Sequence, residues 1–117
     1  MNIEDFRNYC LSLPNVEEKQ PFDEYTLCYY IAGKIFALTD LEHSTYANLK
    51  CNPEKAIELR ERYRGITPGW HMNKKQWNSV AFNSDIDDNL YKELIRHSYN
   101  CVILSLPKKS QQLYELL

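Results

Sequence analysis

The apolar positions recur at helical spacing in the first 13 residues. They follow Asn2, a residue type that caps helices, and stop at Pro14, which cannot continue one. The apolar residues of this segment are Ile3, Phe6, Tyr9, Cys10 and Leu13. Because this spacing places them along one stripe, the pattern predicts a first helix that packs one side on a core.

A polar loop is expected over residues 14–24, and β-branched and aromatic residues follow it. Thr26–Ile31 and Ile35–Thr39 predict two strands, which a tight turn at Gly33 joins into a hairpin. Thr45–Lys50 predicts a third strand. Side chains alternate along a strand, so its odd and even positions face opposite ways: Tyr46 and Asn48 on one side, Ala47 and Leu49 on the other.

Asn52-Pro53 predicts the start of a second helix, because Asn caps free amides and Pro at the first position loses no needed hydrogen bond. This helix is expected to run to about Tyr63 and to stop by Gly65. Next, the segments Trp70–Met72 and Gln76–Phe82 predict a second hairpin. Its tip is Asn73-Lys74-Lys75, and one side of its second strand carries Trp77, Ser79 and Ala81.

Asp87 or Asp88 is expected to cap a third helix that ends around Ser98. The apolar segment Val102–Leu106 stays unassigned, and Ser110–Leu117 predicts a short terminal helix. The predicted order is α-β-β-β-α-β-β-α, which is an α+β fold with helices packed on one antiparallel sheet. With 117 residues and no repeat or linker, the chain is expected to form a single domain over residues 1–117.

The charge is unevenly distributed, although its net value is only −2. Residues 50–75 hold seven basic and three acidic side chains, a net charge of +4, between acidic flanks. A basic cluster is typical of an anion-binding surface, and it is also typical of a solvated helix face. The four cysteines form no CxxC pair, and no secretion signal or apolar span is present, so free thiols and a cytoplasmic location are expected.

The segment from His71 to Asn78 combines two lysines, three amide side chains, a histidine and a tryptophan. On a hairpin tip this set suits nucleic acid: cations reach phosphates, amides reach base edges, and aromatic rings stack. Arg60 extends the same patch. The residues expected at phosphates are Arg62, Arg64, Lys74 and Lys75; those expected at bases or in the turn are His71, Asn73 and Trp77. Alternatively, the lysines belong to a solvated turn and the tryptophans to the core.

The sequence offers weaker support for catalysis or cofactor chemistry. Cys51 and His71 lie in no nucleophile signature, and His43, His71 and His97 lack metal-ligand spacing. The aspartates at positions 85, 87 and 88 are typical of caps and loops. No phosphate-binding loop or dinucleotide fingerprint occurs. We therefore expect no enzyme activity, no cofactor and no metal.

The stretch Pro68-Gly69-Trp70-His71-Met72-Asn73-Lys74-Lys75-x-Trp77-Asn78, with weaker matches such as Gly33-Lys34-x-Phe36-Ala37 and Leu49-Lys50-Cys51-x-Pro53-Glu54, resembles the MmcQ/YjbR family of small bacterial proteins. The match covers nearly the whole chain. This resemblance implies an α+β fold similar to the frataxin/CyaY-like arrangement, described as a double-wing DNA-binding motif. It therefore favours double-stranded DNA as the partner. No membrane is expected, because no apolar run is long enough to span one, and a monomer is expected.

Because the chain is acidic overall, any DNA binding is expected to be weak and sensitive to salt. The alternative is a protein-interaction or small-anion-binding module that uses the same basic patch. Iron or cluster handling, by analogy with the fold, ranks third. It would use the acidic residues Glu4, Asp5, Glu17, Glu18, Asp23 and Glu24.

Overall fold

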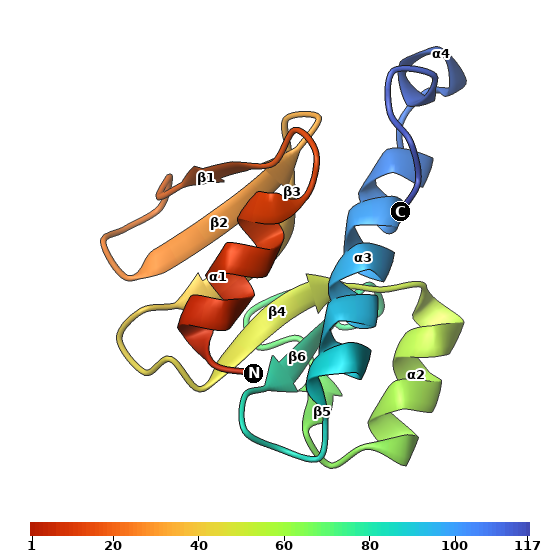
Figure 1. Ribbon diagram of the computed structural model, residues 1–117. Coiled ribbons are helices and arrows are strands. Elements are labelled where there is room, and N and C mark those ends of the chain that lie inside the picture. The colour runs from red at the N-terminus through yellow and green to blue at the C-terminus, as the bar shows by residue number, and fades with distance from the viewer.

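The computed structural model describes residues 1–117. It consists of one antiparallel sheet with helices packed on one face (Figure 1). The elements are α1 (Ile3–Ser12), β1 (Glu17–Lys19), β2 (Thr26–Ile31), β3 (Lys34–Asp40), β4 (Tyr46–Lys50), α2 (Pro53–Arg62), β5 (Ile66–Pro68), β6 (Trp77–Ala81), α3 (Asp88–Leu104) and α4 (Lys108–Gln111). The strands lie in the order β1-β2-β3-β4-β6-β5. This architecture confirms the predicted α+β class.

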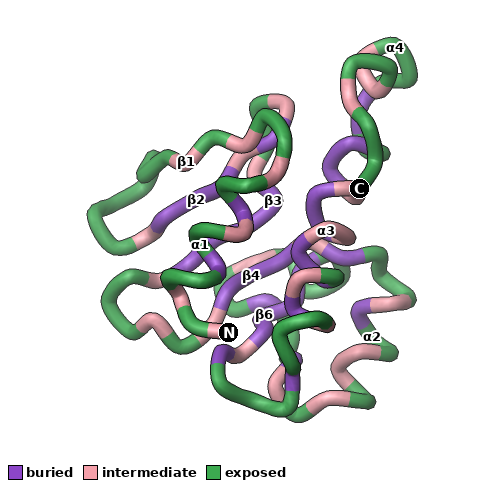
Figure 2. Tube along the Cα trace, in the orientation of Figure 1, coloured by how far each residue is buried: buried purple, intermediate pink, exposed green.

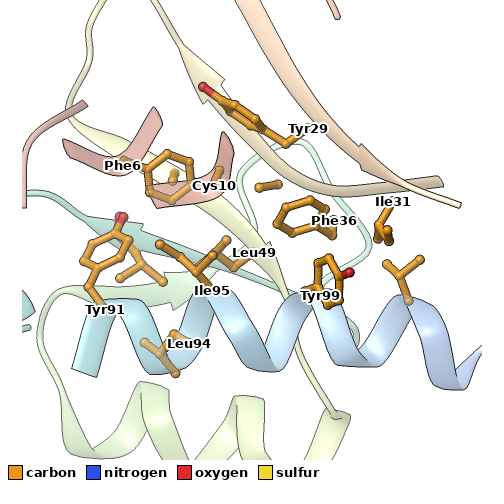
Figure 3. Close-up of a cluster of buried hydrophobic side chains, with 14 of the residues drawn as sticks. Phe6, Cys10, Tyr29, Ile31, Phe36, Leu49, Tyr91, Leu94, Ile95 and Tyr99 are labelled. Carbon is orange, nitrogen blue, oxygen red and sulfur yellow. The ribbon is translucent and has the colours of Figure 1, made fainter. Parts of the chain in front are cut away.

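The hydrophobic core lies between the sheet and the helices α1 and α3 (Figure 3). Phe6 of α1 is fully buried there. Its ring meets three others edge-on, with centroids 5.8 or 5.9 Å away: Tyr29, Phe82 and Tyr91. Burial is concentrated along the central strands and the inner side of α3, whereas the loops and α4 are largely exposed (Figure 2).

The hairpin of β2 and β3 forms as predicted, with Ala32 and Gly33 in the left-handed region at φ 54° and 76°. Two such residues make the kind of turn whose twist matches that of the strands. In β3 a bulge leaves Phe36 without a partner in the ladder. Ser98 of α3 donates its hydroxyl to the Phe36 carbonyl and accepts the Lys50 amide at 2.8 Å. One buried hydroxyl therefore ties α3 to β3 and β4.

The expected loop over residues 14–24 contains a further strand, β1, which pairs with β2 at the edge of the sheet. The sequence did not predict it, because Glu17, Glu18 and Lys19 lack apolar alternation. Edge strands do not need it when charged side chains face water. Glu18 accepts two hydrogen bonds from Arg7, at 2.7 and 3.0 Å, which joins β1 to α1.

The second hairpin differs from its prediction. Its first strand is β5, not Trp70–Met72, and residues 69–76 form a long loop before β6. Because β5 pairs with β6, Trp70 lies outside the ladder. Side chains of β4 and β6 bond to its backbone instead. The alternation along β6 is as predicted, with Trp77 and Ser79 on the face opposite Val80.

The helix ends also differ from the predictions. α3 runs to Leu104 rather than stopping near Ser98, because Val102 and Ile103 continue its buried stripe along the sheet. The last helix is α4, shorter than predicted and placed slightly earlier. α2 ends at Arg62, one residue before the predicted end. No helix is long and apolar enough to cross a membrane.

Candidate ligand-binding groove on the open face of the sheet

The face of the sheet opposite α1 and α3 is only partly covered. Cys28, Leu38 and Trp77 form a small buried cluster on it, with Met72 packed against them. Met72 belongs to the segment 69–76, which therefore lies over one part of this face. Beside the segment the sheet stays open to solvent.

Two buried polar residues on this face hold the segment in place. Asn48 of β4 donates from Nδ2 to the Trp70 carbonyl at 3.0 Å. Ser79 of β6 accepts the Trp70 amide at 2.8 Å and donates its hydroxyl to Oδ1 of Asn48. These three hydrogen bonds form a closed set, so the polar groups of Asn48 and Ser79 are paired and the backbone of Trp70 is fixed. The Trp70 ring itself stays 60% exposed.

Arg60 of α2 anchors the other end of the segment. Its Nε donates to Oδ1 of Asn78 at 2.6 Å, and its Nη2 donates to the carbonyls of Lys74 and, at 3.3 Å, of Trp77. Lys74 in turn donates from Nζ to the Gly69 carbonyl at 2.8 Å. The two cations therefore act as cross-links inside the fold.

The backbone of the segment also needs particular residues. The Gly69 amide donates to the Trp77 carbonyl at 2.9 Å, and a Cβ at Gly69 would lie 2.7 Å from that of Trp77. Only glycine permits so close an approach. His71 adopts a left-handed φ of 60°, and its ring lies edge-on to that of Trp70, with centroids 5.2 Å apart.

The open face carries a groove of about 900 Å³. Its floor comes from β3, β4 and β6, one wall from the segment 69–76, and another from the loops that flank β2 and β3. The lining residues with aromatic rings or apolar chains are Phe22, Tyr25, Ile35, Leu38, Tyr46, Trp70, Met72 and Trp77. The charged or titratable ones are Asp23, Asp40, Glu42, His43 and His71.

The rim between β3 and β4 carries an acid–histidine pair. Nδ1 of His43 lies 2.7 Å from Oδ2 of Asp40. This hydrogen bond lowers the pKa of Asp40 and raises the pKa of His43. With Glu42 they form a group whose ligand atoms lie within 4.8 Å of one another. Asp40 and His43 are held by their own bond, and Glu42 is tied to Asp40 only through its backbone amide, so the group is explained without a cation.

A second hollow of about 280 Å³, which we call the Arg64 hollow, adjoins the groove. Its lining residues are Thr45, Tyr46, Arg64, Gly65, Thr67, Trp70, Ser79 and Ala81. Thr45, Tyr46 and Trp70 line both spaces, so they form the divide between them. Arg64 is the only charged residue of this second hollow.

Comparison with known proteins finds relatives of similar length. A model of the YjbR family matches residues 11–101. The chain belongs to the YjbR family. YbdF of Escherichia coli O157:H7, an uncharacterized protein, is 38% identical over 110 residues, which is 93% of this chain and 90% of YbdF. YjbR of Escherichia coli K12, also uncharacterized, is 26% identical over 97% of each chain.

Solved structures of similar proteins support this assignment. A Deinococcus radiodurans protein, 34% identical, aligns with a TM-score of 0.87 over 96% of this chain and 86% of its own. A Pseudomonas syringae protein, 23% identical, aligns with a TM-score of 0.75 over 86% of this chain and 98% of its own, and shows the same fold. The family match over residues 11–101 and the 38% identical relative confirm the predicted membership of the family.

In this YjbR-family chain the predicted hairpin tip is a structured loop. Asn73 accepts the Lys75 amide on its Oδ1 at 2.9 Å, so it shapes the turn. Lys74 bonds internally to Gly69 and is not a free surface cation. Lys75 is exposed and makes no side-chain hydrogen bond or ion pair. Both lysines are exposed, but only Lys75 has a side chain with no bond inside the protein.

The other predicted site residues lie in different places. Trp77 is buried in the floor of the groove, which favours the alternative that it packs in the fold, whereas His71 is exposed on the wall. Arg62 is exposed and lies over the Tyr63 ring, 5.6 Å from its centroid. Arg64 lines the hollow named after it.

The weaker candidates of the sequence form no single cluster, although His43 and His71 both line the groove. His43 pairs with Asp40, His71 lies beside Trp70, and His97 accepts the Asn52 amide at 3.2 Å next to Cys101. Each histidine therefore has a local environment of its own. Among the acidic residues suggested for iron, Glu18 pairs with Arg7, and Asp23 accepts the amides of Tyr25 and Thr26.

Sequence reasoning missed most of the groove. Phe22 lies in the loop expected over residues 14–24, Tyr25 lies just before the first expected strand, and Asp40 lies just after the second. One signal was present: Tyr46 and Asn48 were predicted to face away from Ala47 and Leu49, and they do. Asn48, the polar residue between these two core positions, lies on the open face of the sheet and lines the groove.

Proposed function

We propose that this YjbR-family protein is a binding protein and that the groove receives a small molecule with a planar ring system. One observation carries the proposal: a hollow of about 900 Å³ lies on the uncovered sheet face, and aromatic side chains surround it. Small-molecule sites are typically concave and mostly apolar, with volumes of roughly 300–1,000 Å³ and a few polar groups.

The exposure of the rings supports the same conclusion. Phe22 is 66% exposed and Trp70 is 60% exposed, although both are large and apolar. A soluble domain rarely leaves several such side chains around one hollow without a use for them. A planar ring placed between them would bury this surface by stacking. The bonds from Asn48, Ser79 and Arg60 hold the Trp70 wall ready before any ligand arrives.

Both tryptophans of the chain line the groove, so it can be observed directly. We would titrate ¹⁵N-labelled protein with 2-naphthylmethanol and follow the two indole N–H signals. Binding in the groove should move both signals and saturate. Unmoved indole signals, with shifts elsewhere or none, would contradict the proposal.

A pair of variants distinguishes binding in the groove from nonspecific hydrophobic binding elsewhere on the surface. Trp70→Ala removes an exposed wall and should weaken binding of the naphthyl probe by about tenfold, as expected for one lost stacking contact. Ile57→Ala removes a 54% exposed side chain on α2, outside the groove, and should leave binding unchanged. Equal affinities for both variants would overturn the assignment of the wall.

DNA binding is a second proposal, and the exposed cations around β5 support it. Arg62, Arg64 and Lys75 lie before β5 or in the loop that follows it, and none has a carboxylate within ion-pair distance. The groove itself is unsuited to a polyanion, because Asp40 and Glu42 line it. A duplex would therefore contact the β5 edge.

The test is a salt series of fluorescence anisotropy with a labelled duplex. Arg62→Gln with Lys75→Gln should reduce the slope of log affinity against log salt by up to about two. Lys108→Gln with Lys109→Gln changes the same charge on α4 and should leave the slope unchanged. Lys74 is unsuitable for this test because its loss would also break the bond to Gly69. A slope that responds equally to both pairs would remove the β5 edge as the contact surface.

A further inference from the structure

The Arg64 hollow offers hydrogen-bond donors without partners inside the protein. The hydroxyls of Thr45, Tyr46 and Thr67 make no hydrogen bond in the structure, and the Arg64 guanidinium has neither a hydrogen bond nor an ion pair. Ser79 differs, because its hydroxyl is already used by Asn48 and Trp70. One guanidinium and three free hydroxyls around a hollow are a donor set for an oxyanion.

The charges around the hollow point the same way. No carboxylate lines it, whereas three line the neighbouring groove. Asp85 lies close by, but its oxygens accept the backbone amides of Arg64 and Gly65, each at 2.8 Å. The bond from Gly65 is the largest cause that lowers the pKa of Asp85, and the Arg64 amide and the nearby Arg64 charge lower it further. Asp85 thus fixes the backbone that presents Arg64, while the guanidinium stays unpaired.

Thr45, Tyr46 and Trp70 line both the hollow and the groove, so a molecule that lies across this shared rim can contact both spaces. We propose that the ligand carries an oxyanion, a carboxylate or a phosphate, which binds at Arg64 while its planar ring lies in the groove. This inference rests on the proposed function of the groove. It differs from the hairpin tip that the sequence suggested for an anion, because Lys74 and Lys75 do not line the hollow.

The experiment compares three probes that share one ring: 2-naphthylmethanol, 2-naphthylacetate and 2-naphthylmethyl phosphate. Affinities come from the tryptophan indole signals. We expect at least one anion to bind about tenfold more tightly than the alcohol, as for one charge-assisted contact. The tighter of the two anions identifies the class of oxyanion.

Two matched variants test the role of Arg64. Arg64→Gln should abolish the advantage of the anion and leave the affinity for the alcohol unchanged. Arg62→Gln removes an equal charge two residues away, outside the hollow, and should preserve the advantage. Equal binding of all three probes, or an advantage that survives Arg64→Gln, overturns the inference while the groove itself stands.

A different result would separate the two proposals. If no probe moves the indole signals, the groove proposal fails, and inorganic phosphate then tests the hollow alone. Saturable shifts of the Gly65 and Thr67 amides that disappear in Arg64→Gln would support an oxyanion site. Unmoved amides would overturn it.

Discussion

Arg60 of α2 and Asn78 of β6 are joined by a hydrogen bond of 2.6 Å, and the same guanidinium reaches the carbonyls of Lys74 and Trp77. A cation that the sequence places in a surface patch therefore serves inside the fold. Arg60→Met keeps the length of the side chain but removes these donors. We expect a loss of about 1.5–3 kcal/mol in the free energy of unfolding, the usual range for hydrogen bonds to a charged group.

Denaturant unfolding measures this loss, and Arg62→Met is the control because Arg62 is exposed and makes no hydrogen bond. Arg60→Met should also speed hydrogen exchange at the Gly69 amide, since the segment 69–76 loses its anchor. Unchanged exchange would mean that the segment is held without Arg60.

Ser98 is expected to be essential for joining α3 to the sheet. Ser98→Ala leaves the bulged Phe36 carbonyl and the Lys50 amide without their partner in a buried position. The expected cost is about 1–3 kcal/mol of unfolding free energy. Ser105 is exposed, and Ser105→Ala removes only its local hydrogen bond to the Val102 carbonyl. This change should lower the free energy of unfolding by less than about 0.5 kcal/mol. Similar unfolding midpoints for both variants would refute this role.

Two phenylalanines should separate stability from binding. Phe6→Ala opens a cavity among three rings and should lower the free energy of unfolding by about 3–5 kcal/mol. Phe22→Ala changes a 66% exposed side chain and should leave it within about 0.5 kcal/mol. Phe22→Ala should instead weaken binding of the naphthyl probe. A stable Phe22→Ala variant with full affinity would exclude Phe22 from the site.

The His43–Asp40 pair at the rim of the groove predicts that the stability of the fold depends on pH. The pKa of His43 is raised by its hydrogen bond to Asp40. Its contribution to stability is therefore fully present below the unfolded pKa, about 6.5, and is lost as pH rises through the higher folded pKa. NMR titration of the His43 ring should show this raised pKa, and Asp40→Asn should return it towards 6.5. An unaltered pKa in Asp40→Asn would contradict the pairing.

Much of the fold could be predicted because its signals are local. Asn2, Asn52 and Asp87 cap their helices as the sequence indicates, each by accepting backbone amides of the first turn. A cap involves only residues two or three positions apart, so it can be recognised from a short stretch of sequence. The Gly33 turn and the alternation of β4 and β6 are equally local.

The elements that escaped prediction depend on distant partners. β1 becomes a strand because β2 offers an edge to it, and α3 continues past Ser98 because the sheet beneath it continues. Lys74 shows the same limit at the site. In the sequence it is a cation at a turn, whereas its neighbour in space, the Gly69 carbonyl, makes it a cross-link.

The sequence by itself determined the class of fold and which strand positions face the core, because periodicity and capping act over a few residues. The family followed from the resemblance of the stretch Pro68–Asn78 and the weaker motifs. Only the tertiary structure decided where ligand chemistry gathers. Asn48 bonds to the Trp70 carbonyl across 22 positions of the chain. Arg64 lines one hollow with Tyr46 and Ser79 because β5 pairs with β6 and β6 pairs with β4. A groove is a relation between strands that are distant in the chain, and sheet pairing creates it.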